Sequence, residues 1–450
     1  MPRPANIFRQ PWLKTSLGHS TVELPESAHA RLHSLKIVPA GVTSRSLILL
    51  RPLNNVPSVL LLVRFTLIIS LPFCCSHSVF AGAWQTDGFH VFQGDSIQTA
   101  LDNVALNPTN KTIKVHAGVY RPEARRQALI WFNRTHDGIR LEAVGDVTLT
   151  AANPELSEPG SSSYPAVVNH VVYFGDGISE RTTLQGFRIT GANHFVTTEP
   201  PEVESSGAFK RDLFFYSDGG AVKIFGHSYP TLRQLEIVDN YASPCAGGIS
   251  VQHQGHGNES GARAVKIENC LFLRNRSQIT GAAFDLLPGS SAVISNCLFV
   301  GNIANLGANY ISANTAQPEF TNSAPLTVFP GSRAIVQRCT FTNNRNGVED
   351  LGGNSRYENC IFWANALDGA FYAGKRYELN IQDRAQVSGC IFGGPVLASE
   401  GIISNSDNQL NGPDPKFDTQ FRPASSLYKE VGFRPGKPTL DVNYSPKKAR

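Results

Sequence analysis

The sequence predicts an all-β solenoid, in which short strands stack in successive coils. Two observations favour this fold. A short phrase built around a cysteine recurs along the second half of the chain, and Gly, Asn and Ser are plentiful. Charged residues make up only 17% of the 450 residues and Met occurs once. The usual charged fraction is about 25%, so this composition argues against coiled coils and helical bundles.

The recurring phrase places a Phe two residues after a Cys, and four of its five copies have an Asn five residues after the Cys. Weaker copies, with Leu235 and Phe187 at the Cys position, precede them, and the spacing between successive copies varies from 21 to 48 residues. A constant phrase with variable gaps is typical of a solenoid whose loops have free length. The full copies are IENCLFLRN (267–275), ISNCLFVGN (294–302), VQRCTFTNN (336–344), YENCIFWAN (357–365) and VSGCIFGGP (387–395).

The two-residue spacing between Cys and Phe is that of a strand whose two side chains share one face. Stacked coils about 4.8 Å apart then pack Cys on Cys and flat Phe rings on Phe. The Asn is expected to adopt a left-handed bend and to bond the backbone of the next coil. We expect reduced, buried cysteines, although the spacing leaves an occasional disulfide open. The predicted axial rows are Cys270, Cys297, Cys339, Cys360 and Cys390, and Phe272, Phe299, Phe341, Phe362 and Phe392.

A second phrase precedes the first in each coil. Its paired small residues allow a sharp turn into a strand with alternating apolar positions. Alignment of these positions places Lys223, Ser250 and Asp285 on the outward side. Residues 96–104 have apolar side chains at helical spacing, so we expect a short helix that caps the open end of the stack. The copies of the second phrase are DGGAVKIF (218–225), AGGISVQH (246–253), TGAAFDLL (280–287) and LGANYIS (306–312).

With these repeats, the chain resembles the right-handed parallel β-helix proteins of the pectin-lyase-like superfamily over roughly residues 90–432. The phrase DPKFDTQFRPASSLYKEVG (414–432) is similar to their closing element. The alternating GGA and FxxN phrases also resemble the repeats of chlamydial polymorphic membrane proteins, which are surface adhesins. The resemblance implies a right-handed parallel β-helix of about eight or nine coils with an N-terminal capping helix. It does not fix a function, because one such scaffold carries many activities.

Residues 57–83, PSVLLLVRFTLIISLPFCCSHSVFAGA, have the apolar run and small-residue end of a secretory signal. We therefore expect residues 1–55 to be an unstructured extension, with the start assigned too far upstream, and 56–83 to be a signal peptide. The β-helix domain is expected at 84–432 and a flexible tail at 433–450. The alternatives are a membrane anchor or a lipid anchor on Cys74 or Cys75. The expected location is secreted or cell-surface, with the periplasm as an alternative.

Formal charge disfavours nucleic acid as a partner. Residues 1–83 hold eight Lys/Arg and two Asp/Glu, which leaves 32 basic and 34 acidic residues in 84–450. This near-neutral body has no basic field to attract nucleic acid or an anionic membrane. We expect a monomer with no membrane span after signal cleavage and a polysaccharide or cell-surface glycan as partner.

Candidate catalytic and binding residues are few. Lys223 and Asp285, two coils apart, and His253 are the weak candidates for catalysis. His253 and His256 lie in QHQGHGN (252–258), which reads either as a solvated loop, the favoured interpretation, or as a metal or general-base site. Phe214 and Tyr216 lie in the insert at 194–217, where aromatic rings either stack on sugars or pack the insert onto the helix.

Two functional hypotheses follow. The first is an exported, cell-surface or structural protein that binds polysaccharide and needs no cofactor or metal. The alternative is a polysaccharide lyase or glycoside hydrolase acting on an acidic glycan, with Ca²⁺ as cofactor if it is a lyase. Whether the protein is an enzyme is left open at this point.

Overall fold

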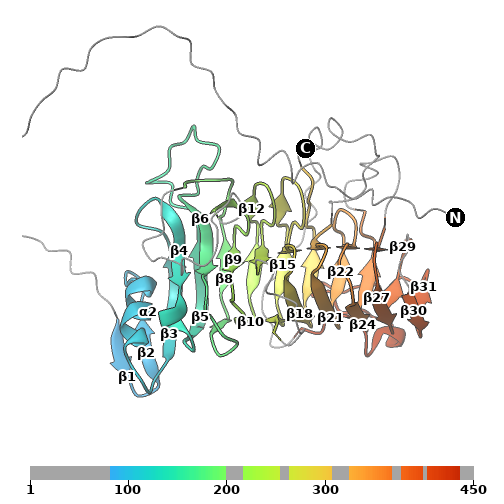
Figure 1. Cartoon of the computed structure of the whole chain (residues 1–450), viewed down its shortest axis with the longest axis horizontal. Helices are drawn as coiled ribbons and strands as arrows, with labels where there is room; N and C mark the ends of the chain where they lie inside the picture. The colour runs from blue at the N-terminus through green and yellow to red at the C-terminus, as the bar shows by residue number, and fades with distance from the viewer. Residues whose placement is uncertain are drawn as a thin grey trace, which may run out of the picture. The chain divides into compact units, whose positions relative to one another are not determined.

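A computed structural model describes residues 82–198, 216–253, 263–306, 324–366, 377–398 and 403–435, all within one compact unit, Val79–Arg450. Across these residues the named strands pair in parallel from coil to coil, apart from the antiparallel hairpin of β1 (Ala83–Gln85) and β2 (Gly88–Val91). The chain is a parallel β-helix (Figure 1). The fold class predicted from the repeated phrase is confirmed.

Most of the strands fall into three rows. Row 1 contains β2, β3 (Thr112–Tyr120), β5 (Arg140–Thr150), β7 (Thr183–Gln185), β10 (Thr231–Arg233), β14 (Val265–Glu268), β18 (Ser291–Ser295), β21 (Arg333–Gln337), β24 (Ser355–Glu358), β27 (Ala385–Ser388) and β30 (Ile403–Ser406). Row 2 contains β8 (Arg188–Thr190), β11 (Glu236–Val238), β15 (Leu271–Leu273), β19 (Leu298–Val300), β22 (Thr340–Thr342), β25 (Ile361–Trp363), β28 (Ile391–Phe392) and β31 (Gln409–Leu410). Rows 1 and 2 form one 20-stranded sheet together with β1.

Row 3 is a separate nine-stranded sheet. Its strands are β4 (Arg126–Phe132), β6 (Val168–Phe174), β9 (Val222–Phe225), β13 (Ile249–Gln252), β17 (Phe284–Leu286), β20 (Leu326–Val328), β23 (Val348–Asp350), β26 (Leu379–Ile381) and β29 (Val396–Ala398). Strands β12 (Tyr241–Ala242) and β16 (Arg276–Ser277) form a third, two-stranded sheet. The strand that follows β17 in row 3 is β20, and the phrase expected to supply it, LGANYIS, lies mostly outside the described residues.

The predicted axial rows are confirmed. Phe272, Phe299, Phe341, Phe362 and Phe392 are register partners on successive strands of row 2. Their rings stack, with centroids 4.4–5.1 Å apart. The five cysteines two residues before them are buried free thiols, as is Cys245. Backbone N–H groups of Cys270, Cys297 and Cys360 each donate to the Sγ of the next cysteine at 3.4 Å.

The recurring asparagines form a hydrogen-bonded ladder between rows 2 and 3. The buried side-chain amides of the first four asparagines each donate to the Oδ1 of the next Asn, at 2.8–3.1 Å, and to a backbone carbonyl of the preceding coil. The left-handed backbone expected at these asparagines instead lies one residue earlier, for example at Arg274, Asn343 and Ala364. The shift leaves the Asn side chain buried inside the stack, where its amide bonds other groups of the protein. The ladder runs through Asn240, Asn275, Asn302, Asn344 and Asn365.

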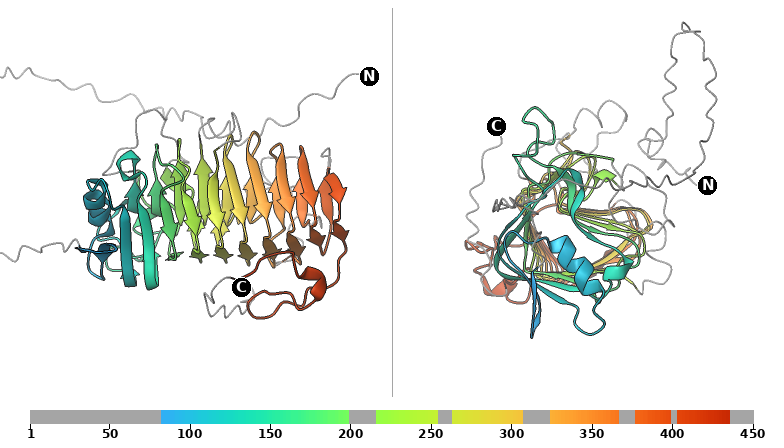
Figure 2. Two further views of the ribbon diagram at one scale, coloured as in Figure 1. Left: turned by 90° about the horizontal axis from the view of Figure 1, so that it is seen from below. Right: turned by 90° about the vertical axis from the view of Figure 1, so that its left-hand side faces the viewer.

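Helix α2 (Ile97–Ala105) forms where the sequence predicts a helix, with Ser96 as its N-cap. Ile97, Ala100, Leu101 and Val104 are buried, and the helix contacts β2, β3 and β4. The Gln98 side chain accepts from the Trp131 backbone N–H at 2.7 Å and donates to the Trp131 carbonyl at 3.1 Å. The helix thus satisfies both backbone hydrogen-bonding groups of Trp131 on β4. Figure 2 shows α2 lying across the end of the stack. None of the helices in the described ranges is long and apolar enough to span a membrane.

Candidate functional site

The three strand rows present three outer faces, and side-chain burial distinguishes them. The outer face of row 3 carries Lys223, Ser250 and Asp285 at directly paired positions on β9, β13 and β17. These residues alternate with the apolar core positions, as predicted. All three are fully buried, however, so this face is not the open surface that the sequence suggests.

Lys223 is held in a buried ion pair. Its Nζ donates to Asp218 Oδ1 at 2.6 Å and to Ser250 Oγ at 3.3 Å, and Ser250 Oγ also donates to Asp218. Both partners of the ion pair have no exposed side-chain surface. The Lys223 ammonium and the Asp218 carboxylate thus neutralise each other. Charged side chains are usually buried only when they are paired in this way.

Asp285 lies two strands from Lys223, about 10 Å along the stack. Its Oδ2 accepts from Thr280 Oγ1 at 2.9 Å. Burial raises the pKa of Asp285 well above its usual value, and the nearby carboxylates of Asp218 and Glu349 raise it further. The carboxyl group is therefore neutral over an extended pH range. The structure brings the two predicted catalytic residues onto one face, but it buries both.

His253 is not a solvated loop residue. It follows β13, is fully buried, and its Nε2 lies 2.9 Å from the Ser228 carbonyl oxygen. Burial lowers the pKa of His253 to about 4, so the imidazole is neutral at physiological pH. Substituting His253 should therefore cost more stability than a surface change would. His256 lies outside the described residues, and the described ranges contain no group of three His, Cys, Asp or Glu side chains that could hold a metal ion.

Tyr216 packs against an aromatic cluster on the outer face of row 3. The Trp131 and Tyr173 rings of this cluster stack with centroids 4.0 Å apart, and Phe225 is buried beside them. The Tyr216 carbonyl also accepts from Gln127 Nε2 at 3.2 Å. Tyr216 thus attaches the end of the insert to row 3, while Phe214 lies outside the described residues.

The outer face of row 2 is apolar and covered. The C-terminal segment runs back along the stack after β31 (Figure 2). Its Phe421 and Phe433 side chains pack in one buried cluster with Leu271, Leu298 and neighbouring side chains of this face. The Phe433 N–H donates to Thr340 Oγ1 at 2.9 Å, and the Arg434 N–H donates to Asn296 Oδ1 at 2.6 Å. The buried packing therefore continues beyond residue 432, where the sequence places the start of a flexible tail.

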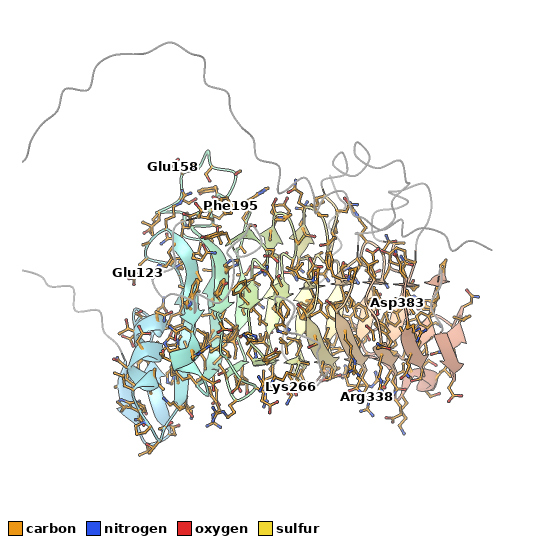
Figure 3. The ribbon with its side chains drawn as sticks, viewed as in Figure 1. Glu123, Glu158, Phe195, Lys266, Arg338 and Asp383 are labelled. Atoms are coloured by element: carbon orange, nitrogen blue, oxygen red, sulfur yellow. The ribbon has the colours of Figure 1, made fainter. Side chains whose placement is uncertain are left out.

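The outer face of row 1 carries a column of partly exposed polar side chains. At one position of each strand from β3 to β27, a hydrogen-bonding side chain stands in register with the next, and all nine are partly exposed. At about 4.8 Å per strand, this polar column is about 38 Å long. Lys266 on β14 and Arg338, just after β21, lie along the same side of the stack (Figure 3). The polar column consists of Lys114, Glu142, Gln185, Arg233, Glu268, Ser295, Gln337, Glu358 and Ser388.

Neighbouring side chains of the polar column bond one another without being buried. Gln337 Nε2 donates to Glu358 Oε2 at 2.7 Å, and the Arg233 guanidinium lies 3.7 Å from the Glu268 carboxylate. The sequence reasoning missed this column. Its signal is present in the repeated phrase, since the residue two before the Cys position is polar in each of the seven copies.

Comparisons with known proteins add little to this site. No family model matches the chain, and no curated protein matches it. The crystal structure of a pectate lyase, Pel9A, matches at 14% sequence identity with a TM-score of 0.34, covering 75% of this chain and 84% of that chain. A similarity at this level carries no argument about function.

Proposed function

We propose that this protein is an exported β-helix protein that binds a polysaccharide along the polar column of row 1, at the cell surface or as a secreted component. The proposal rests on the observation that, of the three outer faces in the described part of the chain, the face of row 1 is the one that stays open to solvent. The outward side chains of row 3 from Lys223 to Glu349 are buried, and the C-terminal segment covers much of the apolar face of row 2. Within the described residues, the polar column is a long repeating surface left open to a ligand.

A linear polymer suits this surface because both repeat along one direction. The polar column offers carboxylates, side-chain amides, hydroxyls, a guanidinium and an ammonium, which together donate and accept hydrogen bonds. Sugar hydroxyls are matched donors and acceptors. Single contacts of this kind are weak, but contacts at successive coils to one chain sum to a useful affinity. The column carries charges of both signs, which fits hydroxyl recognition better than recognition of a polyanion such as nucleic acid.

Binding can be tested with the full-length protein and a panel of immobilised neutral and uronate polysaccharides. We expect at least one polysaccharide to bind, and Glu358→Ala to weaken it about two- to tenfold, the range for one lost hydrogen bond. Glu158→Ala is the matched control because Glu158 is an exposed glutamate on a different side of the stack (Figure 3). Equal losses in both variants, or no binding by the wild type, would contradict the proposal. Release of reducing ends or unsaturated products would favour the enzymatic alternative.

Export makes a separate prediction. The apolar segment at 57–83 ends in small residues suited to cleavage, so mass spectrometry of the secreted protein should give an N-terminus near Gly82 or Trp84. Recovery of residues 1–55 in the mature protein would refute the signal-peptide interpretation.

A further inference from the structure

An exposed aromatic ring lies at the N-terminal end of the polar column. Phe92, directly after β2, is 45% exposed, and its ring stacks on the His116 imidazole with centroids 4.4 Å apart and planes 12° apart. Val144 on β5 is the register partner of His116 and is 38% exposed. These three side chains are here called the end platform.

Hydrogen bonds to His90 hold the His116 ring in place. His90 Nε2 lies 2.8 Å from Asp87 Oδ1, and His90 Nδ1 lies 2.7 Å from His116 Nε2. The Lys114 ammonium and His90 hold the pKa of Asp87 at about 2, so its carboxylate is ionised and only accepts. With both imidazoles neutral, His90 donates from Nε2 and accepts at Nδ1 from the His116 Nε2–H. This assignment leaves His116 Nδ1 as a hydrogen-bond acceptor at the platform.

The end platform is continuous with the polar column. Lys114, the first residue of the column, precedes His116 by two positions on β3, so both side chains point to the same side of the strand. Glu142 stands opposite Lys114 on β5, next to Val144 along that strand. A polymer lying on the column would thus reach an aromatic ring at one end.

We propose that the end platform binds a single pyranose ring of the polysaccharide, stacked on Phe92, while the polymer continues along the polar column. This inference rests on the proposed function. The face of an aromatic ring carries negative charge density that attracts the weakly positive C–H groups of a sugar face. The His116 imidazole and the Lys114 ammonium supply hydrogen bonds to hydroxyls at the rim. A patch of three side chains, bordered by polar groups, suits one sugar ring better than a protein surface.

The proposal is tested with the full-length protein, the polysaccharide that binds best in the panel, and trisaccharides cut from it. We expect Phe92→Ala to weaken trisaccharide binding about three- to tenfold, the range for loss of one aromatic contact, and Phe92→Trp to restore it. Phe195→Ala should leave binding unchanged, because Phe195 is a similarly exposed aromatic residue outside the platform. Gln337→Ala should weaken the polymer alone, since Gln337 lies six strands, or about 29 Å, from Lys114. Thermal melts of all variants establish that they fold.

The outcomes separate this inference from the proposed function. If polymer binding depends on Glu358 while trisaccharides bind Phe92→Ala as well as wild type, the platform is wrong and the column stands. If trisaccharides bind and Phe195→Ala weakens them as much as Phe92→Ala, the platform is also wrong. If no polysaccharide binds the wild type, both proposals fail together.

Discussion

Replacing Phe299 with Ala should lower the free energy of unfolding by about 3–5 kcal/mol, the usual cost of deleting a buried Phe side chain. Phe299 is fully buried, and its ring stacks on Phe272 and Phe341 with centroids 4.5 Å and 4.4 Å away. The cavity therefore opens two coil interfaces at once. In a solenoid each coil is stabilised mainly by its neighbours, so local unfolding should spread from β19 to the adjacent coils.

Thermal melts and amide hydrogen exchange measure this effect. Phe195→Ala is the matched control, because it removes the same atoms from a ring that is 37% exposed and should change stability by less than about 0.5 kcal/mol. Exchange in Phe299→Ala should speed up first at the strands on either side of β19. A Phe299→Ala protein as stable as the control would contradict the stacked-ring core.

Raising the pH should destabilise the protein through Asp350, whose carboxyl group lies inside the β-helix. Asp350 is fully buried and pairs in register with Val328 and Ile381. It accepts hydrogen bonds from the Tyr357 hydroxyl at 2.8 Å and the Gly352 N–H at 2.9 Å. Burial raises the pKa of Asp350 to about 7, although these hydrogen bonds oppose the shift.

The direction of the pH effect follows from proton binding. Between about pH 4 and pH 7 the folded protein holds a proton on Asp350 that the unfolded chain releases. Stability that is present below about pH 4 is therefore lost as the pH rises to about 7. The difference between a pKa of about 7 in the folded protein and about 4 in the unfolded chain sets an upper limit of about 4 kcal/mol.

Urea denaturation at several pH values tests this expectation. Asp350→Asn should remove much of the loss between pH 4 and 7, because an amide keeps the acceptor oxygen and carries no charge. Glu158→Gln, at an exposed glutamate, is the control and should retain the wild-type pH profile. An Asp350→Asn profile that matches wild type would show that Asp350 does not titrate in the folded core.

The sequence predicts the core of this fold well because the same side chains repeat at the same positions. Phe299 and Cys297 meet copies of themselves, so a two-residue period and a repeated phrase suffice to place them. The burial of Lys223 cannot be read in this way. Lys223 can be buried because it bonds Asp218, which lies five residues earlier in the chain, and Ser250 in the next coil. Neither contact follows from a repeating pattern in the sequence.

The polar column shows a different limit. Its residues recur two positions before each Cys, but any solvated strand face has recurring polar residues. The column becomes a candidate site only when the other two faces are seen to be buried or covered, which is a property of the folded chain. The end platform depends likewise on Phe92 and His116, which are brought together by neighbouring strands 24 residues apart.

The asparagine ladder gives the stack a direction for growth. Each Asn side-chain amide donates a hydrogen bond to the next residue of the ladder toward the C-terminal end. The last of them, Asn365, donates to the buried carboxylate of Glu378, which has no proton to donate when it is ionised. An extra coil carrying its own Asn could be inserted anywhere between Asn240 and Asn365 and would extend the same run of bonds. A coil added after Glu378 would have to begin a new run. Duplication of internal coils is therefore the easier route by which such a protein lengthens, and the surface it lengthens includes the polar column.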